Sequence, residues 1–191
     1  MRAIPTLPGV HNWQNAAASY AAVCAVGIEA KAIEAGLKTY PGLAHRQERI
    51  AVIDGVAYIN DSKATNADAA AKALVCYDDI YWIVGGQAKE GGIDSLTPLL
   101  GQVRHTFLIG EAADDFARTL EGKLPFTRSK TLDAAIAAAR ARALADKAKH
   151  PVVLLSPAAA SFDQFTDFEH RGRVFRELVE ALPGKREGRV N

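Results

Sequence analysis

The sequence predicts an α/β protein whose larger part is a mostly parallel, doubly wound sheet. Three observations lead to this prediction. From about residue 48 onward, strand-like apolar runs alternate with helix-like segments. Most of the runs are apolar at nearly every position, as expected for strands whose two faces are both covered by helices. Each run ends in polar or glycine-rich residues, and ligands of open α/β sheets bind at this end of the strands.

Two helices are predicted before the alternating part. Apolar residues recur at near-helical spacing over residues 11–26, and Gly27 ends that helix. A second helix is predicted over residues 29–38, with Gly36 and Pro41 as its stop signals.

The alternating part begins with a predicted β-hairpin. The strand-like runs 49–53 and 56–59 are separated by Asp54-Gly55, a strong signal for a two-residue hairpin turn. Further strands are predicted at 80–84, 106–109 and 152–155, and further helices near 66–76, 94–101, 113–121, 131–148 and 168–181. The chain is therefore divided into a helical part at 1–44, a sheet domain at 45–183 and a flexible, polar tail at 184–191.

Composition excludes several classes of function. The chain has 191 residues, 49% of them hydrophobic, which is enough for a buried core. A net charge of +1 gives no reason to expect affinity for nucleic acid or for acidic membrane surfaces. Cys24 and Cys76 stand apart, so we expect reduced core cysteines. With no apolar run as long as a membrane span, we expect a cytoplasmic protein.

The densest polar cluster is Asn60-Asp61-Ser62-Lys63-Ala64-Thr65-Asn66, at the junction of a predicted strand and helix. Ser62 or Thr65 alone would be enough to cap the helix. A carboxylate, two hydroxyls, an ammonium and two amides together favour a ligand site, where the helix start offers free N–H groups to an anion.

Other strand ends add to the same predicted edge. The glycine-rich segment 85–92 carries Lys89, and the segment 156–165 carries Ser156 and Ser161. Two lysines beside hydroxyls suit a small dicarboxylate or a phosphate. The alternative for Lys89 is a solvated loop lysine.

Two earlier clusters are also candidates. Asn12 and Asn15 open the first helix and would cap it or contact a purine edge. Arg46, beside His45, lies where the two parts meet and is suited to binding phosphate, although such a pair is more often an ordinary surface feature. No G-x-x-x-x-G-K-[ST] phosphate loop occurs in these 191 residues.

These motifs together carry a resemblance to a known family. His11-Asn12-x-x-Asn15, Leu43–Glu48, Asn60–Asn66, Gly85-Gly86 with Lys89, and Leu154–Phe165 occur in the order seen in Mur ligases. Residues 8–182 resemble the C-terminal portion of the D-glutamate-adding members, because Asp61–Asn66 is typical of that branch. The resemblance implies a Rossmann-like C-terminal glutamate ligase domain at 45–183, preceded by a helical remnant of the central ATP-binding domain at 1–44.

The resemblance also implies a reaction and a set of site residues. Such ligases add D-glutamate to UDP-N-acetylmuramoyl-L-alanine through an acyl phosphate in peptidoglycan biosynthesis, using ATP and Mg²⁺. The implied catalytic residues are Arg46 and Lys63. The implied D-glutamate pocket consists of Lys63, Thr65, Lys89, Ser161 and Phe168, and the implied ATP contacts are Asn12, Asn15, Arg46 and Asp61.

Without a phosphate loop, we expect the chain alone to be inactive. The other interpretation is a free-standing, non-catalytic binding module for a small dicarboxylate or a nucleotide. The expected partners are the small substrates, not nucleic acid or membrane. Self-association is also expected through apolar residues exposed on the first two helices.

Overall fold

The computed structural model describes residue 4 and residues 6–187, and it divides the chain into two compact units. The first unit is Met1–Leu43 and the second is Ala44–Asn191. They are called the helical unit and the sheet unit, and each is described by itself.

The helical unit consists of two packed helices, α1 (Val10–Ala25) and α2 (Ala30–Thr39), as predicted. Among its described residues, burial is limited to Ile4, Asn12, Ala16 and Ile33. Cys24 is exposed and Cys76, in the sheet unit, is half-buried. The prediction of core cysteines is therefore wrong for Cys24, because a pair of helices covers only a narrow stripe of each partner.

The sheet unit is built on six strands in the order β1-β2-β6-β3-β4-β5. Their bounds are β1 Glu48–Ile53, β2 Val56–Asn60, β3 Ile80–Gly85, β4 Val103–Ile109, β5 Phe126–Lys130 and β6 Val152–Leu155. Only β1 is antiparallel to its neighbour, β2. Asp54 and Gly55 both have positive φ, at 51° and 78°, as a tight hairpin turn requires. The predicted hairpin and mostly parallel sheet are confirmed.

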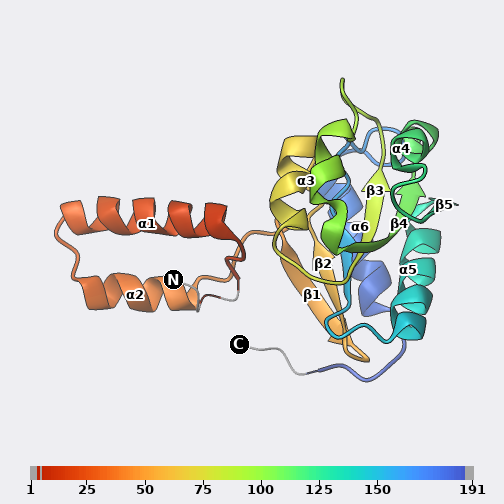
Figure 1. Cartoon of the computed structure of the whole chain (residues 1–191). Helices are drawn as coiled ribbons and strands as arrows, with labels where there is room; N and C mark the ends of the chain where they lie inside the picture. Colours follow the sequence, from red (N-terminus) through yellow and green to blue (C-terminus); the bar gives the residue numbers. More distant parts are fainter. Residues whose placement is uncertain (1–3, 5, 188–191) are drawn as a thin grey trace. The chain divides into compact units, whose positions relative to one another are not determined.

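Helices cover both faces of this sheet (Figure 1). One core lies under α3 (Ala67–Leu74), η1 (Asp94–Gln102) and α4 (Ala113–Leu120). The other lies under α5 (Leu132–Asp146) and α6 (Phe168–Glu180). Side chains alternate along β3, so that Trp82 and Val84 enter the first core while Tyr81 and Ile83 enter the second. Such strands are apolar throughout because neither face meets water.

The topology places a switch point at the carboxyl ends of β2 and β6. These strands are neighbours, yet the chain leaves β2 toward α3 on one face and leaves β6 toward α6 on the other. Ligands of open α/β sheets bind in the crevice formed at such a point.

Two elements differ from the prediction. Strand β5 was not predicted because its sequence, Phe-Thr-Arg-Ser-Lys, is mostly polar. An edge strand needs only the backbone bonds to its one neighbour, here β4, and leaves most side chains in water. The segment expected as a helix at 94–101 is a 3₁₀ helix over 94–102, and Pro98 within it supplies no backbone N–H.

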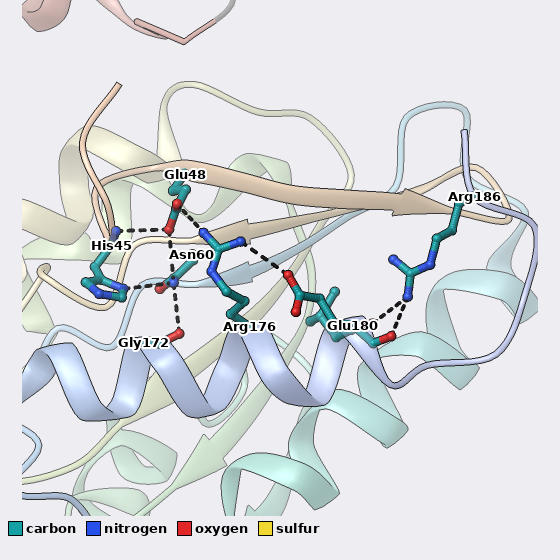
Figure 2. A network of polar contacts seen from close by, with 8 residues as sticks. His45, Glu48, Asn60, Gly172, Arg176, Glu180 and Arg186 are labelled. Atoms are coloured by element: carbon teal, nitrogen blue, oxygen red, sulfur yellow. Dashed lines mark hydrogen bonds and ion pairs between the residues drawn. The ribbon is translucent and has the colours of Figure 1, made fainter. Parts of the chain in front are cut away.

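The first part of the predicted flexible tail is hydrogen-bonded to the sheet unit. The Asp54 N–H donates to the Lys185 carbonyl at 2.9 Å, and the Glu187 N–H donates to the Val52 carbonyl at 3.0 Å. Arg186 donates to the carbonyls of Val179 and Glu180 at the end of α6 (Figure 2). Residues 185–187 are thus bonded to β1 and α6, and residues 188–191 lie outside the described part of the chain.

Candidate functional site

Asp61 joins three segments at the switch point. It follows β2 directly and is only 5% exposed. One carboxylate oxygen accepts from the Ser156 hydroxyl at 2.8 Å, and the other accepts from the Gln47 N–H at 3.1 Å. Burial raises the pKa of Asp61 to about 7, although these two bonds and the positive charge of Arg46 act in the opposite direction. Asp61 therefore holds the 45–48 segment and the end of β6 against the end of β2.

Arg171, on α6, is a buried cation that connects the loops after β2 and β6. It is 1% exposed. Its Nε donates to the Ser62 hydroxyl at 3.0 Å, and its Nη2 donates to the carbonyls of Ser62 at 2.9 Å and Ala159 at 3.1 Å. Burial lowers the pKa of Arg171 to about 10, and the nearby charge of Asp163 opposes this shift. The fork geometry of a guanidinium lets one side chain fix both loops at once.

Glycines bring the loop after β3 against the loop after β6. Gly85 and Gly86 have φ values of 129° and 131°, which residues with side chains rarely adopt. A Cβ at Gly86 would overlap the carbonyl oxygen of Ala160. Gln87 and Ala160 exchange two backbone hydrogen bonds of 2.9 Å. Lys89 follows on this loop, where it is exposed and lines a depression of about 330 Å³ beside Phe116.

Asp163 connects the same edge to β4. Its carboxylate accepts from the Glu111 N–H at 3.0 Å, just beyond Gly110. The neighbouring Gln164 side chain donates to the Lys130 carbonyl at 2.9 Å, at the end of β5. The loop that carries Ser161 is therefore bonded to the ends of three other strands.

The segment His45–Glu48 is fixed to the end of β2 in several ways (Figure 2). The Lys63 N–H donates to the His45 carbonyl at 3.0 Å, and the Asn60 side chain contacts the His45 ring at 3.1 Å. Glu48 forms an ion pair with Arg176 of α6. Arg46 lies within this fixed segment, and its side chain is exposed.

Lys63 lies beside the first residue of α6. Its ammonium is 4.2 Å from the centre of the Phe168 ring, a cation–π contact. Lys63 is exposed, Thr65 is half-buried and Ser161 is 2% exposed. The ammonium is therefore accessible to a ligand while its position is restrained by an aromatic face.

The structure brings most of the predicted site residues to one edge of the sheet unit. Arg46, Asp61, Lys63, Thr65, Ser161 and Phe168 lie around the ends of β2 and β6, and Lys89 lies on the adjoining loop. Asn12 and Asn15 belong to the helical unit, where the Asn12 amide donates to the Pro8 carbonyl at 2.7 Å. Their contact with a nucleotide, and that of Asp61, stay predictions.

No individual role was predicted from the sequence for three residues that hold the site. Asn60 and Gln47 lie within the segments Asn60–Asn66 and Leu43–Glu48, and Arg171 lies outside both. Arg171 lies in Arg-Gly-Arg on an amphipathic helix, a pattern typical of a solvated face. Its burial depends on Ser62 and Ala159, which are far from it in sequence. Among the described residues, no group of three or more histidine, cysteine or acidic side chains could hold a metal ion, and no helix could cross a membrane.

The raised pKa of Asp61 predicts how stability changes with pH. Between its ordinary value of 3.8 and about 7, the folded state holds a proton that the unfolded state releases. Stability from this group is therefore greatest at low pH and is lost as pH rises through that window. The shift of about 3 pKa units corresponds to at most about 4 kcal/mol.

We expect urea unfolding to show a lower free energy of unfolding at pH 8 than at pH 5. Asp61→Asn keeps an oxygen for the Gln47 N–H and cannot ionise, so the variant should lose this part of the pH dependence. An unchanged slope between pH 5 and pH 8 in Asp61→Asn would contradict the assignment.

Two curated proteins that are similar to this chain carry the same name. The chain is 64% identical over 182 residues to a UDP-N-acetylmuramoylalanine–D-glutamate ligase of Paramagnetospirillum magneticum, covering 95% of this chain and 40% of that protein. It is 60% identical over 179 residues to the ligase of that name from Rhodospirillum rubrum, covering 94% of this chain and 38% of that protein. The chain thus spans about 40% of the length of these relatives.

Other comparisons agree on the fold alone. A pseudomurein peptide ligase type C from Methanothermus fervidus is similar in structure, with a TM-score of 0.59 and 20% identity over 90% of this chain and 36% of that one. No family model matches the sequence. At this level of identity, the chain corresponds over nearly its whole length to the C-terminal portion of UDP-N-acetylmuramoylalanine–D-glutamate ligases.

Proposed function

We propose that the sheet unit is the D-glutamate-binding part of an ATP-dependent ligase of peptidoglycan synthesis. The whole reaction adds D-glutamate to UDP-N-acetylmuramoyl-L-alanine through an acyl phosphate. The observation that carries this proposal is the edge at the switch point, where Lys63, Thr65 and Ser161 gather and Lys89 lies on the adjoining loop.

The chemistry of this edge matches D-glutamate. The ligand has two carboxylates, and Lys63 and Lys89 supply two ammonium groups while Thr65 and Ser161 supply hydroxyls. Phe168 offers an apolar face beneath Lys63 for the methylene groups of the ligand. The work of the sheet unit is to bind and orient, because attack by the amine requires a fixed direction of approach.

The ATP-related residues belong to the same proposal. The exposed Arg46 guanidinium suits a nucleotide phosphate, since its backbone is held by Gln47 and His45 on either side. Asn12, Asn15 and Asp61 are proposed nucleotide contacts. ATP with Mg²⁺ would supply the phosphoryl group, and no metal ligand is proposed among the residues of this chain. Without a phosphate loop in these 191 residues, the chain by itself does not hydrolyse ATP.

The other interpretation, a free-standing and non-catalytic binding module, gains nothing from the comparisons. The relatives with the identities given above carry ligase names. A binding role remains part of the ligase proposal, because the sheet unit contributes a substrate pocket to a larger reaction.

The first test of this proposal is binding of D-glutamate by the chain itself. We expect a dissociation constant in the millimolar range or higher, which corresponds to a binding free energy no more favourable than about −4 kcal/mol. Binding is weak because exposed ion pairs contribute only about 0–1 kcal/mol each. In an amide chemical-shift titration, the shifts should cluster at residues 61–66, 86–91 and 156–168. Lys89→Ala should abolish them.

The controls are a second ligand and a second lysine. L-glutamate has the same charges and tests stereospecificity. Lys72→Ala removes an exposed lysine from the last turn of α3 and should leave the titration unchanged. Equal responses to both enantiomers, or shifts confined to residues 11–15, would contradict the proposed site.

We also propose that the helical unit self-associates with a second copy of the chain. Val10, at the start of α1, is 61% exposed, and Val26 and Ile28, between α1 and α2, are 76% and 47% exposed, so a second copy could cover these apolar side chains. Sedimentation velocity at rising concentration should show dimers or larger species. Val26→Asp should shift the distribution toward monomer. Val75→Asp, at a site in the sheet unit that is 62% exposed, is the matched control and should not. A strictly monomeric chain at high concentration would overturn the proposal.

A further inference from the structure

The buried side chain of Asn60 has only one orientation that satisfies its neighbours (Figure 2). Its nitrogen lies 3.0 Å from the Gly172 carbonyl oxygen and 3.4 Å from a Glu48 carboxylate oxygen. Both of these neighbours can only accept hydrogen bonds. Its oxygen accepts from the Ser62 N–H at 3.2 Å. A flipped amide would set oxygen against two oxygens and leave the Ser62 donor without its acceptor.

This orientation fixes the protonation of the His45 ring. The nitrogen of Asn60 lies 3.1 Å from His45 Nδ1, and its two hydrogens serve the two nearest acceptors, the Gly172 carbonyl and Nδ1, so Nδ1 accepts a hydrogen bond from the amide. A neutral imidazole that accepts at Nδ1 carries its proton at Nε2. The ring is also confined from below, because a Cβ at Gly172 would overlap it.

His45 is held in an uncommon backbone conformation. Its φ is 61°, in the left-handed region that residues other than glycine seldom adopt. The surrounding bonds keep it there: its N–H donates to Glu48 at 3.1 Å and its carbonyl accepts from the Lys63 N–H at 3.0 Å. Such conformations persist where neighbouring structure over-determines them, and they are common at functional sites.

The ring of His45 faces the aromatic side chain that underlies Lys63. His45 and Phe168 meet edge to face, with ring centres 6.4 Å apart and an angle of 79° between their planes. Phe168 in turn lies 4.2 Å from the Lys63 ammonium. A continuous series of contacts therefore runs from a buried amide to an exposed cation.

We propose that Asn60 and His45 are positioning residues, which hold Phe168 beneath Lys63 and so set the ammonium for a substrate carboxylate. This inference rests on the proposed function in one respect only, the identity of the substrate. The arrangement of the four side chains exists without any ligand. Neither Asn60 nor His45 needs to touch the substrate in this role.

Several charged groups surround His45 and enter any measurement on it. Burial lowers the pKa of His45, Glu48 and Glu169 act to raise it, and Arg176 and Arg173 act to lower it. At pH 8 the ring is neutral, so its tautomer reports the contact with Asn60.

The first experiment reads the tautomer of His45 in the unmodified chain. Long-range ¹H–¹⁵N spectra at pH 8, assigned with His45→Ala, should show a bare Nδ1 and a protonated Nε2. The opposite tautomer, or an equal mixture of the two, would overturn the role of Asn60. The same spectra show His105, His150 and His170 as internal references.

The second experiment reads the position of Lys63 directly. Its side-chain methylene protons should be shifted upfield by the ring current of Phe168, and Phe168→Ala should abolish that shift. His45→Ala should reduce it at least twofold. His45→Phe should retain it, because an aromatic edge remains and the Asn60 amide keeps Gly172 and Glu48 as acceptors.

Amide spectra of each variant show whether the sheet unit stays folded. Should His45→Ala fail to fold, the milder His45→Leu keeps bulk without an aromatic edge and carries the same expectation. A Lys63 shift that is unchanged in a folded variant lacking the aromatic edge would overturn the proposal.

The third experiment connects the arrangement to binding. His45→Ala should weaken D-glutamate binding about two- to fivefold, the range that a cation–π contact at an exposed site supports. Unaltered affinity in His45→Ala, together with a lost Lys63 ring shift, would contradict the effect on the substrate. Failure of the unmodified chain to bind D-glutamate would contradict the proposed function. The positioning role would still be decided by the upfield shift of the Lys63 methylene protons, which is measured without ligand.

Discussion

The candidate site depends on one buried cation, the guanidinium of Arg171. An unpaired buried charge is costly, and this one has no carboxylate within its set of hydrogen bonds. Its acceptors are the carbonyls of Ser62, Ala159 and Ala160 and the Ser62 hydroxyl. Because the same head group needs both loops for its bonds, displacement of either loop would leave a buried charge poorly satisfied. The loops that carry Lys63 and Ser161 are thereby held in fixed positions relative to each other.

The carboxyl group of Asp61 connects further segments in a similar way. It connects the end of β2 to Ser156 after β6 and to Gln47 before β1. The switch point thus contains a buried carboxyl group and a buried guanidinium that form no ion pair with each other. Each is bonded mainly to backbone groups and hydroxyls, so the site is held by the chain itself. The exposed Lys63, Lys89 and Arg46 remain available for anionic ligands.

The stability of the sheet explains why the fold tolerates a buried polar network at the strand ends. Strands such as β3 are buried on both faces, and the two cores under the helices stabilise them independently of the loops. Glycines at 85 and 86 then allow loop backbones to approach closely at the carboxyl edge. Rigid strands with closely packed ends suit a function of positioning a substrate.

The sequence was sufficient for much of this architecture. Asp54-Gly55 marked the hairpin, and apolar runs marked β3 and β6, because these features depend on local conformation and on burial of whole strands. The strand ends also indicated Lys63, Thr65, Lys89 and Ser161. Strand β5 escaped notice because an edge strand carries polar residues. The roles of Arg171, Asn60 and Gln47 could not be predicted because their partners lie elsewhere in the chain: Asn60, although part of the predicted polar cluster, contacts Gly172, 112 residues away.

The most direct test of the central claim is hydrogen exchange in Arg171→Lys. This variant keeps the charge but cannot form the fork of bonds to both loops. The account predicts faster exchange at the amides of Lys63 and Gln87, which bond to His45 and Ala160, while strand amides such as that of Ile83 stay protected. Wild-type protection at Lys63 and Gln87 would contradict it, and so would an equal loss of protection throughout β3.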